Sequence, residues 1–145
     1  MTQAAETARS TGTVSVVVER EIPHPPEKVW RALTQQHLIA EWLMANDFEP
    51  TLGRRFGLHW EAPNGMKGDI EAEVLTIEPH RTLAYSWCSM GVDSVVTFTL
   101  TPTSGGTHLK MEQAGFKGDQ KPNIEGARYG WTGFLAKLDD VAGKS

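Results

Sequence analysis

The chain has 145 residues, 39% of them hydrophobic and 22% charged, and a formal net charge of −4 at pH 7. Its length suits one domain with one core, and its composition is that of a folded protein rather than a disordered one. A slightly acidic chain lacks the broad positive field that supplies most of the affinity for nucleic acids, so DNA and RNA are excluded as partners.

Neither a membrane span nor a disulfide is expected. The longest apolar runs are strand-sized, well below the ~20 residues that cross a bilayer. Cys88 is the single cysteine and cannot form an intramolecular disulfide, and the first residues, MTQAAETARSTG, do not resemble a signal peptide. We therefore expect a cytoplasmic protein.

The first predicted strand follows a short polar segment. Residues 1–12 show no periodicity and are interpreted as a flexible N-terminal tail, so that residues 13–145 form the single domain. In TVSVVVEREI (13–22), alternating β-branched residues predict a strand with one buried face. The prolines that follow end this strand, and Pro26 suits the first turn of a helix. Two short helices are predicted, within PEKVWRALT (26–34) and HLIAEWLM (37–44).

Alternation with period two then predicts a meander of antiparallel strands. The strands are RFGLHW (55–60), GDIEAEVLTIEP (68–79), RTLAYSW (81–87), DSVVTFTLT (93–101) and THLKMEQ (107–113). A phase break at Val74 and Leu75 indicates a bulge in a curved strand. Met90–Gly91 and PTSGGT (102–107) predict turns, the second because Gly105 and Gly106 can take positive φ.

A long C-terminal helix is predicted from about Pro122. Its apolar residues step by three or four along one stripe: Ile124, Ala127, Trp131, Leu135, Leu138 and Ala142. Gly126, Gly130 and Gly133 each cost this helix up to ~1 kcal/mol relative to alanine. We therefore expect a reason for them, such as the close approach of another surface.

The order of strand, two short helices, antiparallel strands and one long helix is an α+β plan. Five sequence words occur in this order between residues 13 and 142: HPPEKVWRALT, EWLM, VLTIEPHRTLAYSW, VTFTLTPTSGGTHL and YGWTGFLAKL. In order and spacing they resemble the activator-of-heat-shock-ATPase homologues, which belong to the START-like, polyketide-cyclase-like (SRPBCC) superfamily.

The resemblance implies a helix-grip fold, as in START domains and the birch-pollen allergen. In that fold a curved antiparallel sheet of six or seven strands surrounds the long C-terminal helix, with two short helices after strand one. Across the superfamily the enclosed cavity holds hydrophobic small molecules, so an apolar or aromatic ligand is the first expected partner. A chaperone is the second, by analogy with the eukaryotic namesake. A cyclase or hydrolase is a third interpretation.

The predicted inward faces suggest which residues line such a cavity. Aromatic, sulfur-containing and aliphatic side chains point inward, together with one amide: Trp60, Tyr85, Trp87, Phe98, Met111, Gln113, Trp131 and Leu135. The same side chains can equally fill the core. Gln113, Ser94 and Arg128 are candidates to orient a ligand, although each can also lie at the rim.

The sequence does not indicate catalytic or metal chemistry. The five histidines form no pair at i, i+4 and have no cysteine or carboxylate partner at ligand spacing, so neither a metal nor another cofactor is expected. Cys88 lies opposite the inward face without a cue for a lowered pKa. Glu71 and Glu73 alternate outward, toward water. No catalytic residue is assigned, and Tyr85 is the best candidate if an enzyme is present.

Overall fold

The computed structural model describes residues 13–89 and 92–144. Its elements in chain order are β1 (Thr13–Ile22), α1 (Pro26–Thr34), α2 (Gln36–Trp42), β2 (Ala45–Asn46), β3 (Arg55–Glu61), β4 (Lys67–Glu78), β5 (Thr82–Ser89), β6 (Val92–Thr103), β7 (Gly106–Lys117) and α3 (Lys121–Lys144). The predicted tail, residues 1–12, and the predicted turn at Met90–Gly91 lie outside the described residues.

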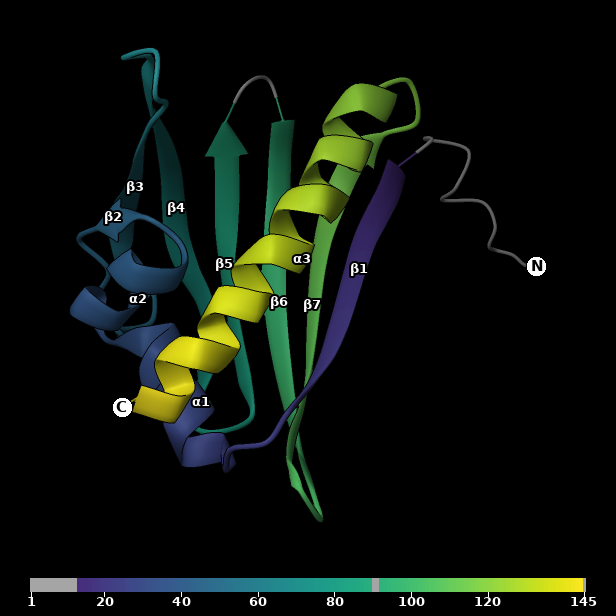
Figure 1. The fold of residues 1–145 in the computed structure, drawn as a ribbon. Coiled ribbons are helices and arrows are strands. Elements are labelled where there is room, and N and C mark those ends of the chain that lie inside the picture. The colour runs from purple at the N-terminus through teal and green to yellow at the C-terminus, as the bar shows by residue number, and fades with distance from the viewer. Residues whose placement is uncertain (1–12, 90–91, 145) are drawn as a thin grey trace.

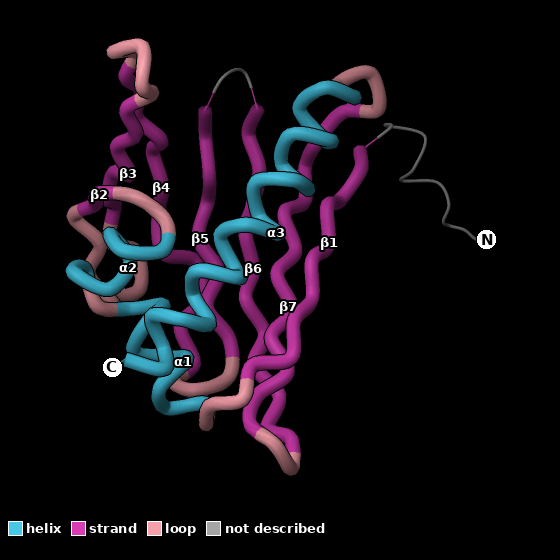
Figure 2. Tube along the Cα trace, in the orientation of Figure 1, coloured by secondary structure: helices cyan, strands magenta, loops and turns pink. Residues whose placement is uncertain are grey.

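The strands form one antiparallel sheet in the order β1-β7-β6-β5-β4-β3-β2. The long helix α3 runs diagonally across one face of this sheet, and α1 and α2 lie beside its C-terminal end (Figures 1 and 2). This is the helix-grip fold, so the predicted fold class is confirmed. The two-residue strand β2 escaped the sequence prediction because it is too short to show alternation.

The two short helices form where the sequence predicts them. Proline occupies the first position of α1, where a missing N–H costs nothing. The apolar sides of both helices are buried against α3 and each other. The Trp42 indole N–H donates to the Ala32 carbonyl oxygen over 2.7 Å, which ties α2 to α1. No described helix is long and apolar enough to cross a membrane.

Two bulges change which side chains face the core. The predicted bulge in β4 is present, since the β4–β5 register shifts between Val74 and Thr76. A second bulge lies in β7 at Gly115, whose φ of +121° is accessible to glycine. Simple alternation would turn residue 115 inward after Gln113, but the bulge turns Phe116 inward instead, where it is buried.

The hairpin between β6 and β7 needs only one of its two glycines. Gly106 has a φ of +152°, and a Cβ there would lie 2.2 Å from the Ile22 carbonyl oxygen. Gly105 is not among the residues with positive φ, and no atom lies within 4 Å of its Cβ position. The predicted turn is present, and of its two glycines only Gly106 adopts a positive φ.

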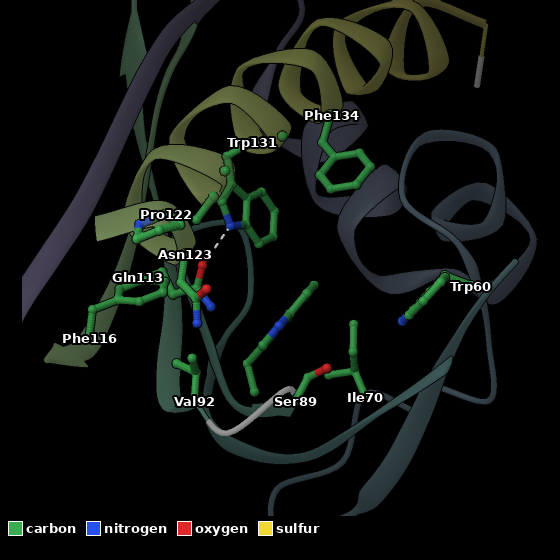
Figure 3. A pocket seen from close by; sticks show the side chains of 14 residues that line it. Trp60, Ile70, Ser89, Val92, Gln113, Phe116, Pro122, Asn123, Trp131 and Phe134 are labelled. Atoms are coloured by element: carbon green, nitrogen blue, oxygen red, sulfur yellow. Dashed lines mark hydrogen bonds between the residues drawn. The ribbon is translucent and has the colours of Figure 1, made fainter. Parts of the chain in front are cut away.

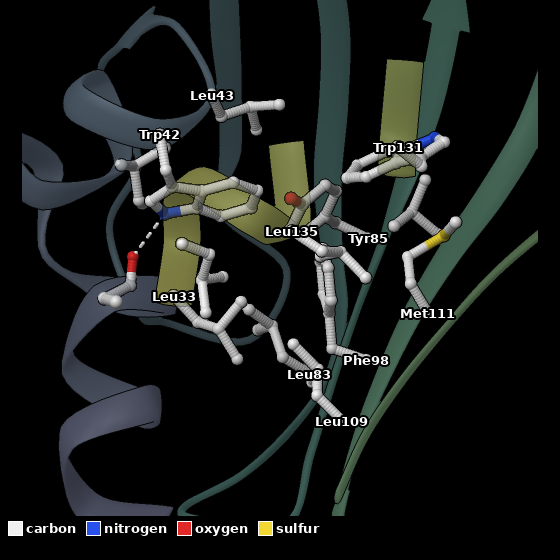
Figure 4. Packing of buried hydrophobic residues seen from close by; sticks show 14 of the residues in the cluster. Leu33, Trp42, Leu43, Leu83, Tyr85, Phe98, Leu109, Met111, Trp131 and Leu135 are labelled. Atoms are coloured by element: carbon white, nitrogen blue, oxygen red, sulfur yellow. Dashed lines mark hydrogen bonds between the residues drawn. The ribbon is translucent and has the colours of Figure 1, made fainter. Parts of the chain in front are cut away.

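The C-terminal end of α3 is fixed to β1 and to the segment between β1 and α1. Asp139 lies 3.1 Å from the Arg20 guanidinium on β1 and 3.6 Å from the His24 ring nitrogen. Beneath it, buried side chains from the sheet and the helices pack together, including Leu33, Trp42, Leu83, Phe98, Leu109 and Leu135 (Figure 4). The core is therefore filled at this end, and the N-terminal half of α3 covers the other end of the sheet.

Candidate functional site

A pocket of about 360 Å³ lies between the N-terminal half of α3 and the sheet. Fourteen residues line it: Trp60, Ile70, Trp87, Ser89, Val92, Gln113, Phe116, Pro122, Asn123, Gly126, Ala127, Gly130, Trp131 and Phe134 (Figure 3). This volume is at the lower end of the ~300–1,000 Å³ typical of small-molecule sites. We call it the tryptophan pocket.

The tryptophan pocket has three walls from different parts of the chain. The end of β5 and the start of β6 supply Trp87 and Val92, and α3 lies across from them. The β3–β4 hairpin supplies Trp60 and Ile70. The described register between β4 and β5 begins at Glu71↔Cys88, and the β3–β4 ribbon leans away from β5 beyond that point (Figure 1). This divergence keeps the wall formed by the β3–β4 hairpin apart from the wall formed by β5 and β6.

Aromatic rings define the interior of the pocket. The Trp131 ring centroid lies 5.3 Å from that of Trp87, 5.8 Å from that of Phe98 and 5.6 Å from that of Phe134. These distances and the tilted or edge-on angles are those of favourable aromatic contacts. Trp60 lies across the opening from the wall that carries Gln113 (Figure 3). A flat apolar molecule would therefore meet ring faces on several sides.

A chain of buried hydrogen bonds fixes the polar part of the pocket wall. The Trp131 indole N–H donates to Gln113 Oε1 over 2.8 Å, and Gln113 Nε2 donates to Ser94 Oγ over 2.9 Å. Ser94 in turn donates to the Trp87 carbonyl oxygen over 2.9 Å. Because an indole nitrogen only donates, the amide oxygen must face Trp131, so the orientation of Gln113 is determined.

The described lining residues include no Asp, Glu, His, Lys, Arg or Tyr. The polar side chains among them are Ser89, Gln113, Asn123 and the tryptophan indoles. General acid–base chemistry needs a titratable group within reach of the substrate, and a charged ligand needs a counter-charge. The described wall supplies neither, so the arrangement is suited to holding a neutral molecule.

The structure separates the eight predicted cavity residues into two groups. Trp60, Trp87, Gln113 and Trp131 line the tryptophan pocket. The other four lie in the packed core outside its lining: Tyr85, Phe98, Met111 and Leu135, each no more than 4% exposed. Of the three candidates for orienting a ligand, Ser94 is reached only through Gln113, and Arg128 is exposed on the outer side of α3. Ligand binding by any of these residues stays a prediction.

Several lining residues were not predicted from the sequence. Phe116 faces the pocket because of the bulge at Gly115, and an isolated glycine inside a strand is a signal for such a bulge. Gly126 and Gly130 were recognised only as unusual helix residues. Phe134 and Asn123 lie beside the predicted apolar stripe of α3, and no sequence signal distinguishes them from surface positions.

The titratable groups singled out from the sequence lie outside the pocket lining. Burial raises the pKa of the Tyr85 phenol, which packs among the rings of Phe48, Phe56 and Phe98. Burial, followed by a hydrogen bond to Asp93, raises the pKa of the Cys88 thiol. A raised pKa disfavours the thiolate, so Cys88 lacks the activation of a catalytic nucleophile.

His108 and two glutamates form a surface cluster on the other face of the sheet, and this histidine has a perturbed pKa. The His108 ring nitrogens contact Glu21 and Glu19, and these hydrogen bonds raise the pKa of His108. Among the described residues, no group of three or more His, Cys, Asp or Glu is arranged to hold a metal ion.

Two other hollows, of about 620 and 630 Å³, lie on the outer side of α3 and beside the start of α1, and both are more open to solvent than the tryptophan pocket.

Residues 23–143 match the model of the family described as Activator of Hsp90 ATPase homolog 1-like protein. No curated protein matches the chain. The match covers α1 through nearly all of α3 and therefore includes every element that lines the pocket.

Solved structures of several bacterial proteins are similar. Protein MLL2253 from Mesorhizobium loti is 51% identical, with a TM-score of 0.83, covering 91% of this chain and 98% of that one. CalU16 from Micromonospora echinospora is 26% identical, with a TM-score of 0.74, covering 88% and 75%. NE0264 from Nitrosomonas europaea, 18% identical with a TM-score of 0.80 over 90% and 95% of the chains, shares the fold.

Proposed function

Because this chain belongs to the Activator of Hsp90 ATPase homolog 1-like family, whose model matches residues 23–143, we propose that it binds a neutral, flat aromatic molecule in the tryptophan pocket. Family membership alone does not choose between a ligand-binding protein and a cyclase-like enzyme, since one fold serves many functions. The chemistry of the pocket wall favours binding.

The observation that carries the proposal is the combination of three indole rings with a described lining that has no ionisable side chain. Indole and phenyl rings offer large apolar area and stack on other aromatic faces. An ionised ligand that binds against this wall would lose its hydration without gaining a charged partner, and this desolvation costs free energy. The pocket should therefore discriminate against charge more strongly than against small changes of shape.

Gln113 adds a specific polar contact. A glutamine amide has two N–H donors and two acceptor lone pairs. The bonds to Ser94 and Trp131 use one donor and one lone pair, and Gln113 also lines the pocket. The second donor and the second lone pair can pair with a carbonyl, hydroxyl or amide group on the ligand. An aromatic molecule with one such neutral group fits the site best.

A matched pair of small molecules tests the proposal. We expect 2-naphthamide, which is neutral, to bind and to shift the indole N–H resonances of Trp60, Trp87 and Trp131 in heteronuclear NMR spectra. Its isosteric anion, 2-naphthoate, should bind at least tenfold more weakly, because a carboxylate at this wall has no counter-charge.

Two variants supply the control. Trp87→Leu changes a lining residue and should weaken binding of 2-naphthamide, whereas Tyr129→Leu changes an aromatic residue of α3 that is 86% exposed and outside the pocket lining. The second variant should bind as the unaltered protein does. If 2-naphthamide shifts none of the three indole signals at millimolar concentration, or if the anion binds as well, the proposed ligand chemistry is wrong.

A further inference from the structure

Trp60 lies directly over a glycine of the neighbouring strand. Trp60 on β3 and Gly68 on β4 are paired in the register of the hairpin. A Cβ built on Gly68 would lie 2.3 Å from Trp60 Cζ2, 2.4 Å from Cε2 and 2.6 Å from Nε1. Real Cβ atoms do not approach other heavy atoms so closely, so the indole occupies the space that any larger residue at position 68 would need.

The contact is on the pocket side of the sheet. Ile70 follows Gly68 by two residues on the same face of β4, is buried, and lines the pocket together with Trp60. The β4 backbone lies beneath the indole. An indole lifted off this backbone must therefore move away from the sheet, toward the space that faces α3.

Support for the Trp60 ring comes from within the β3–β4 ribbon itself. A tight turn closes the ribbon, with hydrogen bonds from Ala62 N–H to the Met66 carbonyl and from Gly65 N–H to the Ala62 carbonyl. The ribbon leans away from β5 toward its tip (Figure 1). Glycine inside a strand weakens it, and it is found where another group must approach closely. At Gly68 that group is the indole of Trp60.

We propose that Gly68 is a positioning residue for Trp60 and that this pair sets the width of the tryptophan pocket. With glycine at position 68 the indole lies against the β4 backbone, and the pocket stays open to a planar ligand. With a larger residue the raised indole narrows the opening. The proposal rests on the proposed function for its effect on binding, although the position of the indole can be tested without any ligand.

The first measurement concerns the protein alone. One Gly68 Hα proton occupies the direction in which a Cβ would point, so it lies against the Trp60 indole ring and its resonance should be clearly displaced by the ring current. Trp60→Ala should abolish this ring-current shift, and Trp87→Leu should leave it in place. A Gly68 Hα shift that is the same in Trp60→Ala as in the unaltered protein would overturn the assigned contact, whatever the protein binds.

The second measurement is a double-mutant cycle on the binding of 2-naphthamide, followed through the Trp131 indole N–H. Gly68→Ala should weaken binding about tenfold or more, since even one added methyl group forces the ring to move. Trp60→Ala should weaken binding about two- to tenfold through the lost aromatic contact. Adding Gly68→Ala to Trp60→Ala should change binding less than about twofold, because no ring is then displaced.

Gly57 provides the matched control. It lies on the opposite face of the same hairpin, and a Cβ there would lie 2.9 Å from Cε1 of the exposed His59 ring. Gly57→Ala should therefore leave ligand binding unchanged. If Gly68→Ala weakens binding equally with and without Trp60, or not at all, the positioning role is wrong. If the unaltered protein does not bind 2-naphthamide, the proposed function fails, and the ring-current measurement still decides the Trp60–Gly68 contact.

Discussion

Replacing Gln113 by leucine tests the buried hydrogen-bond chain most directly. Gln113 and Trp131 are each 3% exposed, and the indole N–H has Gln113 Oε1 as its acceptor at 2.8 Å. Leucine fills a similar volume but leaves this buried donor without its partner, which costs about 1–3 kcal/mol. Ser94 keeps its bond to the Trp87 carbonyl, so the loss falls mainly on Trp131.

The pair is best measured as a double-mutant cycle in urea, with far-UV circular dichroism as the probe because it does not depend on tryptophan emission. We expect Gln113→Leu and Trp131→Phe each to lower the free energy of unfolding. The double variant should lose less than the sum of the two by about 1 kcal/mol or more, since neither the orphan donor nor its acceptor remains. None of the groups titrates near neutrality, so the coupling should not change between pH 6 and pH 9.

A neighbouring variant controls for general disturbance of the core. Met111 lies two residues before Gln113 on the inward face of β7 and is fully buried. Met111→Leu conserves volume and removes no hydrogen bond, so it should cost less than about 1.5 kcal/mol. If the effects of Gln113→Leu and Trp131→Phe on the free energy of unfolding add to within about 0.5 kcal/mol, the idea that the Gln113–Trp131 bond stabilises the pocket wall is refuted.

Three further predictions concern the rest of the fold. Gly106→Ala should destabilise the protein by more than about 1 kcal/mol in urea, since its Cβ would meet backbone at 2.2 Å, whereas Gly105→Ala should be neutral; equal effects would contradict the assigned turn geometry. The His108 pKa, measured by NMR, should lie above 6.5 and fall when its two glutamate partners become glutamine. Because its folded-state pKa is raised, the protonated ring contributes its full stabilisation below the unfolded pKa of about 6.5. This contribution is lost as pH rises through the folded pKa, so the Tm advantage over His108→Gln should shrink in that direction; an advantage independent of pH would be inconsistent with this. Asp139→Asn should lower the free energy of unfolding by only about 0.2–1 kcal/mol, because the Arg20 partner is 40% exposed; a loss of several kcal/mol would show that the ion pair is more than a surface contact.

The sequence was sufficient for the fold and for every described element except the two-residue strand β2, because these elements carry their own periodicity. Alternating residues mark the faces of β1 and of β3 to β7, and the three-and-four spacing marks α3. The bulge in β4 was visible as a phase break at Val74 and Leu75. The bulge in β7 was not, because the predicted strand ended at Gln113, before Gly115 could break its alternation.

The candidate site was only partly predictable, because it depends on where the long helix α3 crosses the sheet. Alternation tells which face of a strand is inward, but not where the diagonal helix crosses that strand. The side chains of Tyr85 and Phe98 point to the same face of the sheet as Trp87. They lie, however, at the end of the sheet that α2 and the segment after it cover. Phe48 contacts Tyr85 there, and Trp42 contacts Phe98. Such long-range packing leaves no local pattern in the sequence.

Gly126, Gly130 and Gly133 of α3 have free space beside them rather than a closely packed surface. The sequence led us to expect another surface close to them, but no atom lies within 4 Å of the Cβ position of Gly126 or Gly133, and at Gly130 the nearest is Phe134 at 3.9 Å. Gly126 and Gly130 both line the tryptophan pocket. Each weakens the helix by up to ~1 kcal/mol, so a chain that only needed a stable core would gain from alanine or leucine at both positions. Larger residues there would add side-chain atoms to the pocket wall. The cost to the helix thus keeps volume free at the end of the sheet where Trp60, Trp87 and Trp131 meet, which is the expected trade-off if that volume receives a ligand.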